Sequence, residues 1–397
     1  MNKKLIAVAV GSVLAAPAIV FAQASSVTIY GRANLGVDTY AATGSSGGQA
    51  SDHAKRSRVY DSGSRLGFRI TEALSKGYSA DVTIETGVNI DTGTGLGQSG
   101  VANTSTGALA SRASFVGLNT PGGTVRLGRQ EVFWANGVNA QTGANYINTS
   151  VDGLLVAHGM VAAPAARTSN TVTYMAPRWG GLDLTLQWSP QNEAAIAGAS
   201  APGTNSVTSD DILAVTAAYT QGPIYLQFNH AVTETETTAT AARERVGTKF
   251  GASYSFAPGS RIGYIHQRLT ASNYRAAIGN TVNIGDNLKV NFNVFNIEHT
   301  MGQWGLYGVY ARAGSVTGAS GADTTGTEVR GFTLGAKYHL SNRTGAYVSY
   351  NKVTNGANAF ADLSGGGYGV GVTTGALAAA NEGADVKIFA VGMMHNF

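Results

Sequence analysis

Charged side chains of both signs alternate with apolar ones in residues 63–87, GSRLGFRITEALSKGYSADVTIETG. Arg65 and Arg69 share one side of the first half, and Asp81 and Glu85 share one side of the second. A period of two places alternate side chains on opposite faces of a β-strand. Guanidinium groups stay charged at any relevant pH and bind carboxylate or phosphate through paired donors. The chemistry open to such a face is the binding and steering of ions.

The same periodicity continues almost to the end of the chain and predicts sixteen short strands. They start near residues 26, 64, 78, 112, 123, 170, 182, 211, 224, 244, 260, 288, 302, 328, 344 and 385. Short turns are expected at 73–77, 120–122, 179–181, 221–223, 257–259 and 341–343. They alternate with long loops near 41–63, 91–111, 131–169, 191–210, 271–287 and 355–384, and with shorter ones near 235–243 and 317–327. An up-and-down barrel with short turns at one rim and long loops at the other predicts this rhythm.

A closed barrel in a membrane explains the segregation of charge. Every backbone N–H and C=O must be paired within the protein inside a bilayer, so a spanning sheet closes on itself. A Lys or Arg on the lipid face costs about 2 to 4 kcal/mol at the midplane. The charges of residues 63–87 must then face a wet lumen. The alternative is a soluble sandwich whose polar face points outward, and its prediction is the opposite placement of these charges.

Residues 1–24 have the pattern of a secretory signal peptide. Lys3 and Lys4 precede an apolar run, and Ala22, Gln23 and Ala24 fit an A-x-A cleavage site, with cleavage after Ala22 or Ala24. An N-terminal membrane anchor is the alternative, although the apolar run is shorter than the ~20 residues that a spanning helix needs. Residues 25–397 are then expected to form one exported barrel domain.

Composition excludes several classes of protein. The absence of cysteine excludes disulfides, thiolate metal sites and cysteine nucleophiles. Removing Lys3 and Lys4 from the 27 basic residues leaves 25 against 23 acidic ones, a formal charge of +2, which is too little for a nucleic-acid binder. The seven histidines stand in no motif, so a barrel protease or phospholipase is not expected. The loop acids Asp91, Asp210, Asp211 and Asp362 lack EF-hand spacing, so no metal site is expected either.

Six motifs in order resemble the trimeric Gram-negative general porins of the beta-proteobacterial type. They are SSVTIYGRANLGVDTY, SRLGFRITEALSKGYSADVTIETGVNIDTG, RASFVGLNTPGGTVRLGRQ, SNTVTYMAPRWGGLDLTLQW, YHLSNRTGAYVSY and VGMMHNF. The turn in the second motif lacks the usual second acidic residue of that family. The resemblance implies an all-β, 16-stranded antiparallel transmembrane barrel with an inward-folded third loop. It also implies an outer-membrane location, a homotrimer, contact with lipopolysaccharide, and no cofactor or enzymatic activity.

The last residue has an expected role in assembly. Phe397 ends a strand with apolar residues at alternate positions. In the resembled family such an end pairs with the first strand and is recognised by the outer-membrane assembly machinery. The alternative is an ordinary edge strand. For the trimer contact, only Gly31 and Ala33 are small outward residues in the first strand.

The longest loop, 131–169, is expected to fold into the lumen as it does in the resembled porins. A segment of this length without periodicity needs a function or disorder to explain it. Phe133, Trp134, Leu154 and Leu155 favour packing on the inner wall over the alternative of a mobile external loop.

Parity assigns the pore-lining charges. The inward basic residues are Arg32, Arg65, Arg69, Arg126, Lys249 and Lys337, and the inward acids are Asp38, Asp81, Glu85 and Asp183. Arg129 has outward parity, but a bulge beside Gly128 could turn it inward, and the resembled family has a basic residue of its GRQ motif at the constriction. Within the loop the acids are Glu131 and Asp152, and Arg167 lies near its end.

We expect Arg32, Arg65, Arg69 and Arg126 to form a basic ladder that gives weak to moderate anion selectivity. The alternative is that Asp81 and Glu85 neutralise Arg65 and Arg69. The expected function is passive diffusion of ions and small hydrophilic solutes. A channel specific for a sugar or an organic anion is the other possibility. A sugar pore needs an aromatic track along the lumen, whereas the inward aromatics lie on separate strands, namely Tyr30, Phe115, Tyr225 and Tyr347.

Overall fold

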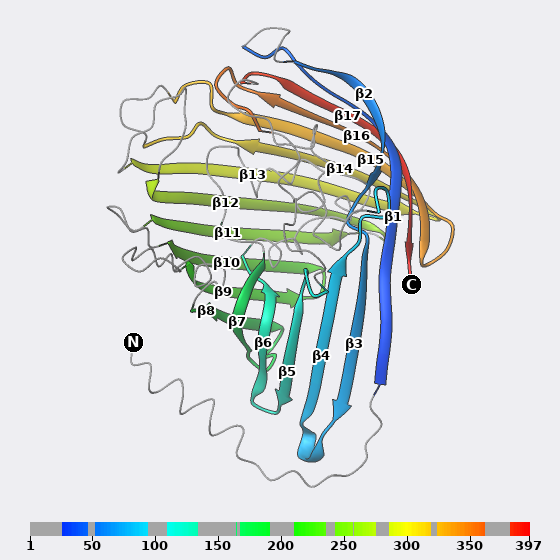
Figure 1. The fold of residues 1–397 in the computed structure, drawn as a ribbon, viewed down its shortest axis with the longest axis vertical. Helices are drawn as coiled ribbons and strands as arrows, with labels where there is room; N and C mark the ends of the chain where they lie inside the picture. The colour runs from blue at the N-terminus through cyan, green and yellow to red at the C-terminus, as the bar shows by residue number, and fades with distance from the viewer. Residues whose placement is uncertain are drawn as a thin grey trace.

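A computed structural model describes residues 26–46, 52–93, 109–133, 164, 167–190, 210–235, 243–256, 258–274, 286–318, 324–361 and 382–397. The described chain is almost entirely β-strand (Figure 1). The first strands are β1 Ser26–Thr43, β2 His53–Asp61, β3 Arg65–Ala73, β4 Ser79–Gly87, β5 Ser114–Thr120, β6 Gly123–Glu131, β7 Arg167–Met175 and β8 Leu182–Ser189. The others are β9 Asp210–Gln221, β10 Ile224–Thr235, β11 Arg243–Phe256, β12 Ser260–Tyr274, β13 Asp286–Met301, β14 Trp304–Ala313, β15 Val329–His339, β16 Thr344–Asn355 and β17 Asp385–Asn396. A single short 3-10 turn, Ser75–Gly77, is described, and no helix in the described ranges is long and apolar enough to cross a bilayer.

The strands form one closed antiparallel barrel. Apart from β2 and β3, which both pair with β1, each strand pairs with its sequence neighbour, and β1 pairs with β17 from Arg32↔Asn396 to Thr43↔Asp385. The other edge of β1 pairs with β3 and then with β2. Since β2 and β3 follow each other along the same edge, they count as one interrupted strand, and the barrel has sixteen strands as predicted.

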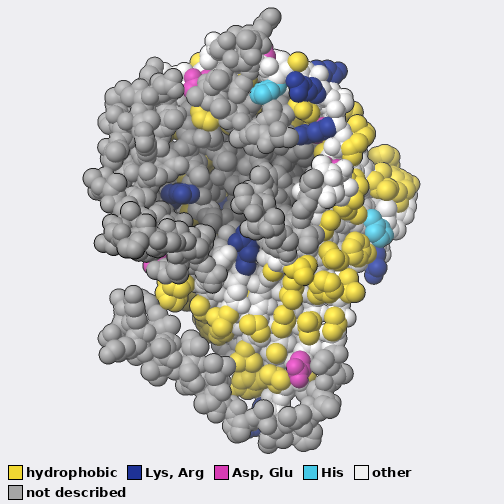
Figure 2. All heavy atoms as spheres, in the orientation of Figure 1, with side chains coloured by type: hydrophobic (Ala, Val, Ile, Leu, Met, Phe, Trp, Pro, Cys, Tyr) yellow, Lys and Arg dark blue, Asp and Glu magenta, His cyan; other side chains and the backbone are white. Residues whose placement is uncertain are grey.

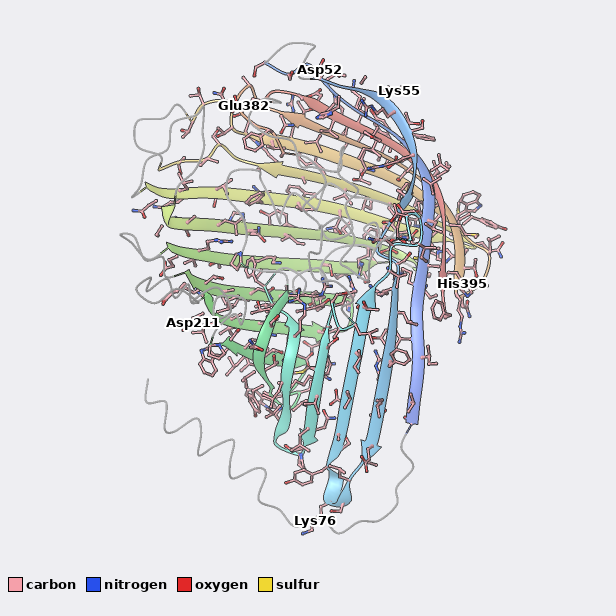
Figure 3. All side chains as sticks on the ribbon, in the orientation of Figure 1. Asp52, Lys55, Lys76, Asp211, Glu382 and His395 are labelled. Atoms are coloured by element: carbon pink, nitrogen blue, oxygen red, sulfur yellow. The ribbon has the colours of Figure 1, made fainter. Side chains whose placement is uncertain are left out.

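The predicted loop 41–63 is largely wrong. β1 continues to Thr43 and β2 occupies His53–Asp61. The sequence of β2, HAKRSRVYD, lacks apolar alternation because Lys55 and Arg56 are exposed on a strand that extends to the rim. Figure 3 places Lys55 and Asp52 at this rim, with Lys76 of the β3–β4 turn at the opposite one.

The outer face of the barrel is apolar and its inner face is polar. In β1, Ile29 and Val37 are 60% and 50% exposed, whereas Asn34 and Asp38 are buried inside. Figure 2 shows hydrophobic side chains gathered over the outer face, with few charged ones among them. Arg65, Asp81 and Glu85 take part in the interior ion pairs described below, which rules out the soluble sandwich.

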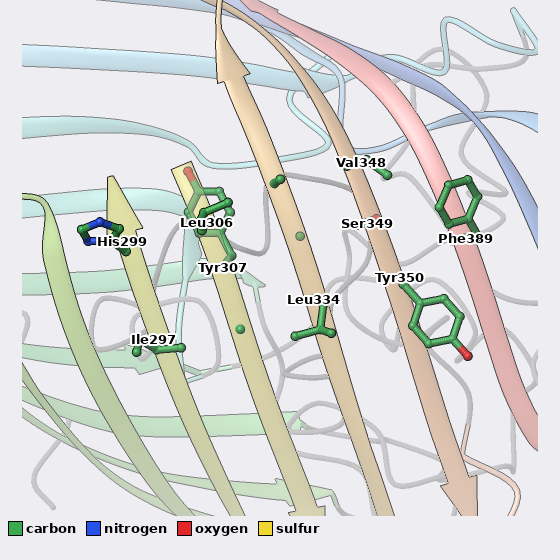
Figure 4. A pocket seen from close by; sticks show the side chains of 12 residues that line it. Ile297, His299, Leu306, Tyr307, Leu334, Val348, Ser349, Tyr350 and Phe389 are labelled. Atoms are coloured by element: carbon green, nitrogen blue, oxygen red, sulfur yellow. The ribbon is translucent and has the colours of Figure 1, made fainter. Parts of the chain in front are cut away.

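The outer face carries a shallow apolar groove across β13 to β17 (Figure 4). The small residues Gly308 and Ala336 leave room there, and Ile297, Leu334 and Phe389 surround them. This hollow faces away from the lumen, so it is part of the lipid-facing surface and takes no part in the polar site.

The last residue closes the seam between β17 and β1, as predicted. The backbones of Gly31 and Phe397 exchange two hydrogen bonds of 3.0 and 3.1 Å, and Figure 1 shows the C-terminus beside β1. A Cβ on Gly31 would collide with the Phe397 ring and would lie 2.6 Å from the carbonyl oxygen of Arg65. The ring therefore fills the space over Gly31, and a trimer contact at Gly31 and Ala33 stays a prediction.

Candidate pore lining and constriction

Glu85 is the centre of a charge network on the inner wall. Its carboxylate lies 2.5 Å from Nε of Arg112 and 3.9 Å from Nε of Arg65, and the Tyr30 hydroxyl donates to it at 3.1 Å. Arg112 is 2% exposed and precedes β5, where strand parity does not apply. Sequence reasoning missed this arginine for that reason. The arrangement compensates the charge of Glu85 fully and that of Arg65 in part.

Asp81 pairs with Arg126 of β6 instead of an arginine of its own hairpin. Nη2 of Arg126 lies 3.2 Å from Oδ2 of Asp81, and Asn119 donates to Oδ1 at 2.9 Å. The Arg126 guanidinium also lies 4.4 Å from the centroid of the Phe115 ring. The alternative that the two hairpin acids neutralise Arg65 and Arg69 is thus right for Glu85 with Arg65 and wrong for Asp81.

Arg69 has no carboxylate within 4.0 Å among the described residues. Its guanidinium lies 5.0 Å from the centroid of the Tyr30 ring, and its side chain is exposed. Arg32 stands opposite Arg65 in the β1–β3 register and donates from Nε to Asn396 at 3.0 Å. Arg69 therefore keeps a charge that no described acid compensates.

Arg129 is half-buried between the ends of neighbouring strands. The β6–β7 register shifts between Gly128 and Gln130, but the extra residue belongs to β7, where Asn170 has φ 55°. Arg129 donates to the Ser111 carbonyl and to the Ser169 hydroxyl, both at 3.0 Å. A turn of Arg129 into the lumen stays a prediction.

The two ends of the longest loop are tied together and extend to a distant strand. Glu131 and Arg167, which face each other in the β6–β7 register, form an ion pair of 2.7 Å. Gln187 of β8 donates to the Glu131 carbonyl at 2.8 Å. Two residues further on, Phe133 contacts β11 through Lys249. The segment 134–163, with Trp134, Asp152, Leu154 and Leu155, lies outside the described residues, so its inward fold stays a prediction.

A cavity of about 540 Å³ with a mixed polar and apolar lining opens on the inner wall between β5 and β10. Phe115, Tyr225, Gln227, Arg126 and Asp183 are among its lining residues. The two aromatics come from strands that are far apart in sequence, and the curvature of the wall brings them to one cavity. The two aromatics lie on separate strands, as predicted, but they line the same cavity.

The ion pair between β1 and β2 was also not predicted from the sequence. Arg58 of β2 lies 3.1 Å from Asp38 of β1, and Asp38 is only 1% exposed. Parity predicted Asp38 as inward, but its partner belongs to the range that was expected to be a loop. Asp38 and Arg58 carry opposite charges and face each other across the β1–β2 register. This pairing could be predicted only if residues 53–61 were recognised as a strand.

The closed sheet, the apolar exterior and the charged interior define a membrane-spanning β-barrel. A family model described as Gram-negative porin matches residues 7–358. The chain belongs to this family, whose members are outer-membrane proteins.

Comparisons with single proteins agree with that assignment. The major outer membrane protein P.IB of Neisseria gonorrhoeae is 30% identical over 203 residues, which cover 50% of this chain and 51% of the relative. The alignment thus spans about half the length of this curated relative. The solved anion-selective porin from Comamonas acidovorans has a TM-score of 0.68 at 21% identity, covering 94% of this chain and 100% of that one. OmpT of Vibrio cholerae, solved in a trimer form, has a TM-score of 0.62 at 12% identity, covering 94% and 100%. At these identities the two structures show the shared fold.

Proposed function

We propose that the protein is a water-filled channel for the passive diffusion of ions and small hydrophilic solutes across the outer membrane. The observation that carries this proposal is the inner wall, where arginines, carboxylates and amides line a barrel whose outer face is apolar. Such charges are tolerated within a membrane where they face a water-filled cavity. No step of the transport needs a cofactor, bond making or an energy source.

The basic residues support a weak to moderate anion preference. Arg69 keeps an uncompensated charge, while acids 3.2 and 3.9 Å away offset much of the charge of Arg126 and Arg65. In a passage narrower than the Debye length of about 8 Å, the field of such a charge is incompletely screened. A bias of about 1.4 kcal/mol corresponds to tenfold selectivity. The porin from Comamonas acidovorans, which shares the fold, is itself described as anion-selective.

Reversal potentials in planar bilayers test this function directly. The purified protein is added to one side of a membrane that separates two concentrations of potassium chloride. We expect stepwise conductance increases and a reversal potential whose sign shows a preference for chloride. A preference for potassium would contradict the arginine assignment, and an absence of conductance would contradict the channel itself.

We propose a homotrimer embedded in the lipid bilayer and in contact with lipopolysaccharide. The solved trimer form of the Vibrio cholerae protein supports this assembly. We further propose that the outer-membrane assembly machinery recognises the strand that ends in Phe397. Sedimentation of the detergent-solubilised protein should give three copies per particle, and sedimentation as a monomer would contradict the trimer.

A channel specific for a sugar or an organic anion is the second candidate. The cavity that contains Phe115 and Tyr225 beside Gln227 favours it, because aromatic faces and amides together bind sugar rings. Saturable block of the ion current by one solute and not by its isomers would establish this candidate. Current that falls only in proportion to bulk conductivity would leave the general channel.

We also propose that the protein has no enzymatic activity. Incubation with peptide and phospholipid substrates should give no product. Turnover of either substrate by the pure protein would overturn this proposal.

A further inference from the structure

Lys249 is a fully enclosed lysine on the inner face of β11, with only 1% of its surface exposed. Its Nζ donates a hydrogen bond to the Phe133 carbonyl at 3.0 Å and lies 4.6 Å from the centroid of the Phe133 ring. Phe133 is equally buried. A charge-assisted hydrogen bond and a cation–π contact both stabilise an ammonium group away from bulk water. The two residues therefore form a specific contact between the exit of β6 and the wall at β11.

Gly247 makes room for this contact. A Cβ at this position would lie 2.6 Å from Cζ of Phe133 and 2.9 Å from Cδ of Pro164. Any other residue would thus displace both side chains. Pro164 lies near the opposite end of the long segment, just before β7. Both described ends of the segment therefore meet the wall at the same place.

The contact between Lys249 and Phe133 lies across the barrel from the arginines of β3. With β2 and β3 counted as one strand, eight positions separate β3 from β11 in either direction around the sixteen-stranded barrel. β11 is thus opposite the wall that carries Arg65 and Arg69. Phe133 starts from β6, so it must pass in front of the strands between β6 and β11 to reach Lys249.

We propose that Gly247 and Lys249 form a cradle that holds Phe133 and Pro164 against β11 and thereby sets the open width between this wall and the arginines of β3. Lys249 and Gly247 are positioning residues in this proposal, which rests on the proposed channel function. Loss of the cradle releases Phe133 and Pro164 from the wall, and the passage then changes in cross-section without any change in the barrel strands.

Single-channel conductance of matched variants tests the cradle. Lys249→Met removes the donor and the charge but keeps the stem, and Phe133→Ala removes the ring without altering any barrel strand. We expect both variants to shift the unitary conductance in the same direction and to broaden its distribution. Lys249→Arg, which retains a donor and a charge, should restore a conductance close to that of the wild type. Gly247→Val should reproduce the shift by filling the cradle.

Lys337→Met on β15 is the control for charge alone. Lys337 is another inner-wall lysine, so its loss changes the lumen charge by the same unit without touching Phe133. We expect this variant to alter the reversal potential and to leave the width of the conductance distribution unchanged. Heat-modifiable electrophoretic mobility verifies that each variant forms a barrel.

The outcomes separate the cradle from the channel function. A wild-type protein that forms no channels contradicts the proposed function. A conducting wild type whose Lys249→Met and Phe133→Ala variants keep its unitary conductance overturns the cradle and leaves the channel intact. The same holds if Lys249→Met and Lys337→Met behave alike.

Discussion

The partner of each charged side chain decides how much of its field reaches the lumen. Alternation in the sequence predicts the face on which Arg69, Arg126 and Asp81 lie, and the structure agrees. It does not predict that Asp81 reaches Arg126 two strands away, because pairing depends on the stagger between strands and on side-chain length. Arg112 could not be predicted, since it lies just before a strand where the backbone turns.

Opposite charge changes on the inner wall should shift selectivity in opposite directions. Asp81→Asn removes the acid that compensates Arg126, so the preference for chloride should increase. Arg69→Gln removes an arginine that has no acidic partner among the described residues, so that preference should decrease. Reversal potentials in a potassium chloride gradient measure both shifts. Thr83→Ser, on the same inner face of β4, serves as a neutral control, and shifts of the same sign for both charge variants would contradict the assignment.

At the scale of the element, fifteen of the predicted strand starts need only small corrections, but the second strand is longer than predicted. Apolar alternation reports contact with lipid, so it marks the part of a strand inside the bilayer. β2 continues that strand toward the rim, where both faces of the sheet contact water and the alternation is lost. Turn residues such as Ser75–Gly77 are local and could be predicted, whereas the course of β2 depends on its pairing with β1.

The seam strand should tolerate no side chain at Gly31. Gly31→Val places a branched side chain where the Phe397 ring and the Arg65 carbonyl lie, and overpacking of this kind costs about 1 to 3 kcal/mol. We expect a lower yield of folded barrel and a lower melting temperature, measured by heat-modifiable mobility. Ala33→Val, two residues along the same outward row, is the matched control. Equal stability of the two variants would show that the ring adapts freely.

The outer face should reject charge according to depth. Leu334 on β15 is 57% exposed to the lipid side, and Leu340 just beyond the end of the strand is 54% exposed. Leu334→Arg should destabilise the folded state by about 2 to 4 kcal/mol, and Leu340→Arg by about 0 to 1 kcal/mol. Denaturant unfolding in lipid vesicles measures both values. Equal costs would contradict the membrane boundary inferred from the strand ends.

At the scale of the whole molecule, the charges around the lumen make the ion selectivity depend on ionic strength. Arginines of β1 and β3, acids of β4 and Arg126 of β6 form adjacent stripes of alternating sign. The sequence alone predicts a barrel of sixteen strands with these charges inside. It does not predict that Phe133 and Pro164 meet the wall at β11, because that contact depends on the folded barrel.

Raising the salt concentration should weaken selectivity. The screening length falls from about 10 Å at 0.1 M to about 3 Å at 1 M, so the fields of the wall charges then fade within the passage. We expect the reversal potential measured at a fixed salt ratio to approach zero as both concentrations rise. Selectivity that is independent of salt would indicate a size filter or a specific binding site instead of the wall arginines.

The seam between the two terminal strands also constrains the order of events during biogenesis. Arg32 and Asn396, which bond across it, are 364 positions apart, so the most remote parts of the chain must meet before the cylinder exists. Pairings between such distant segments are slow to form. A chain that lacks its final strand retains two unpaired edges, and edges of that kind recruit other strands and aggregate. Completion of the polypeptide is thus a precondition for a closed barrel without free edges.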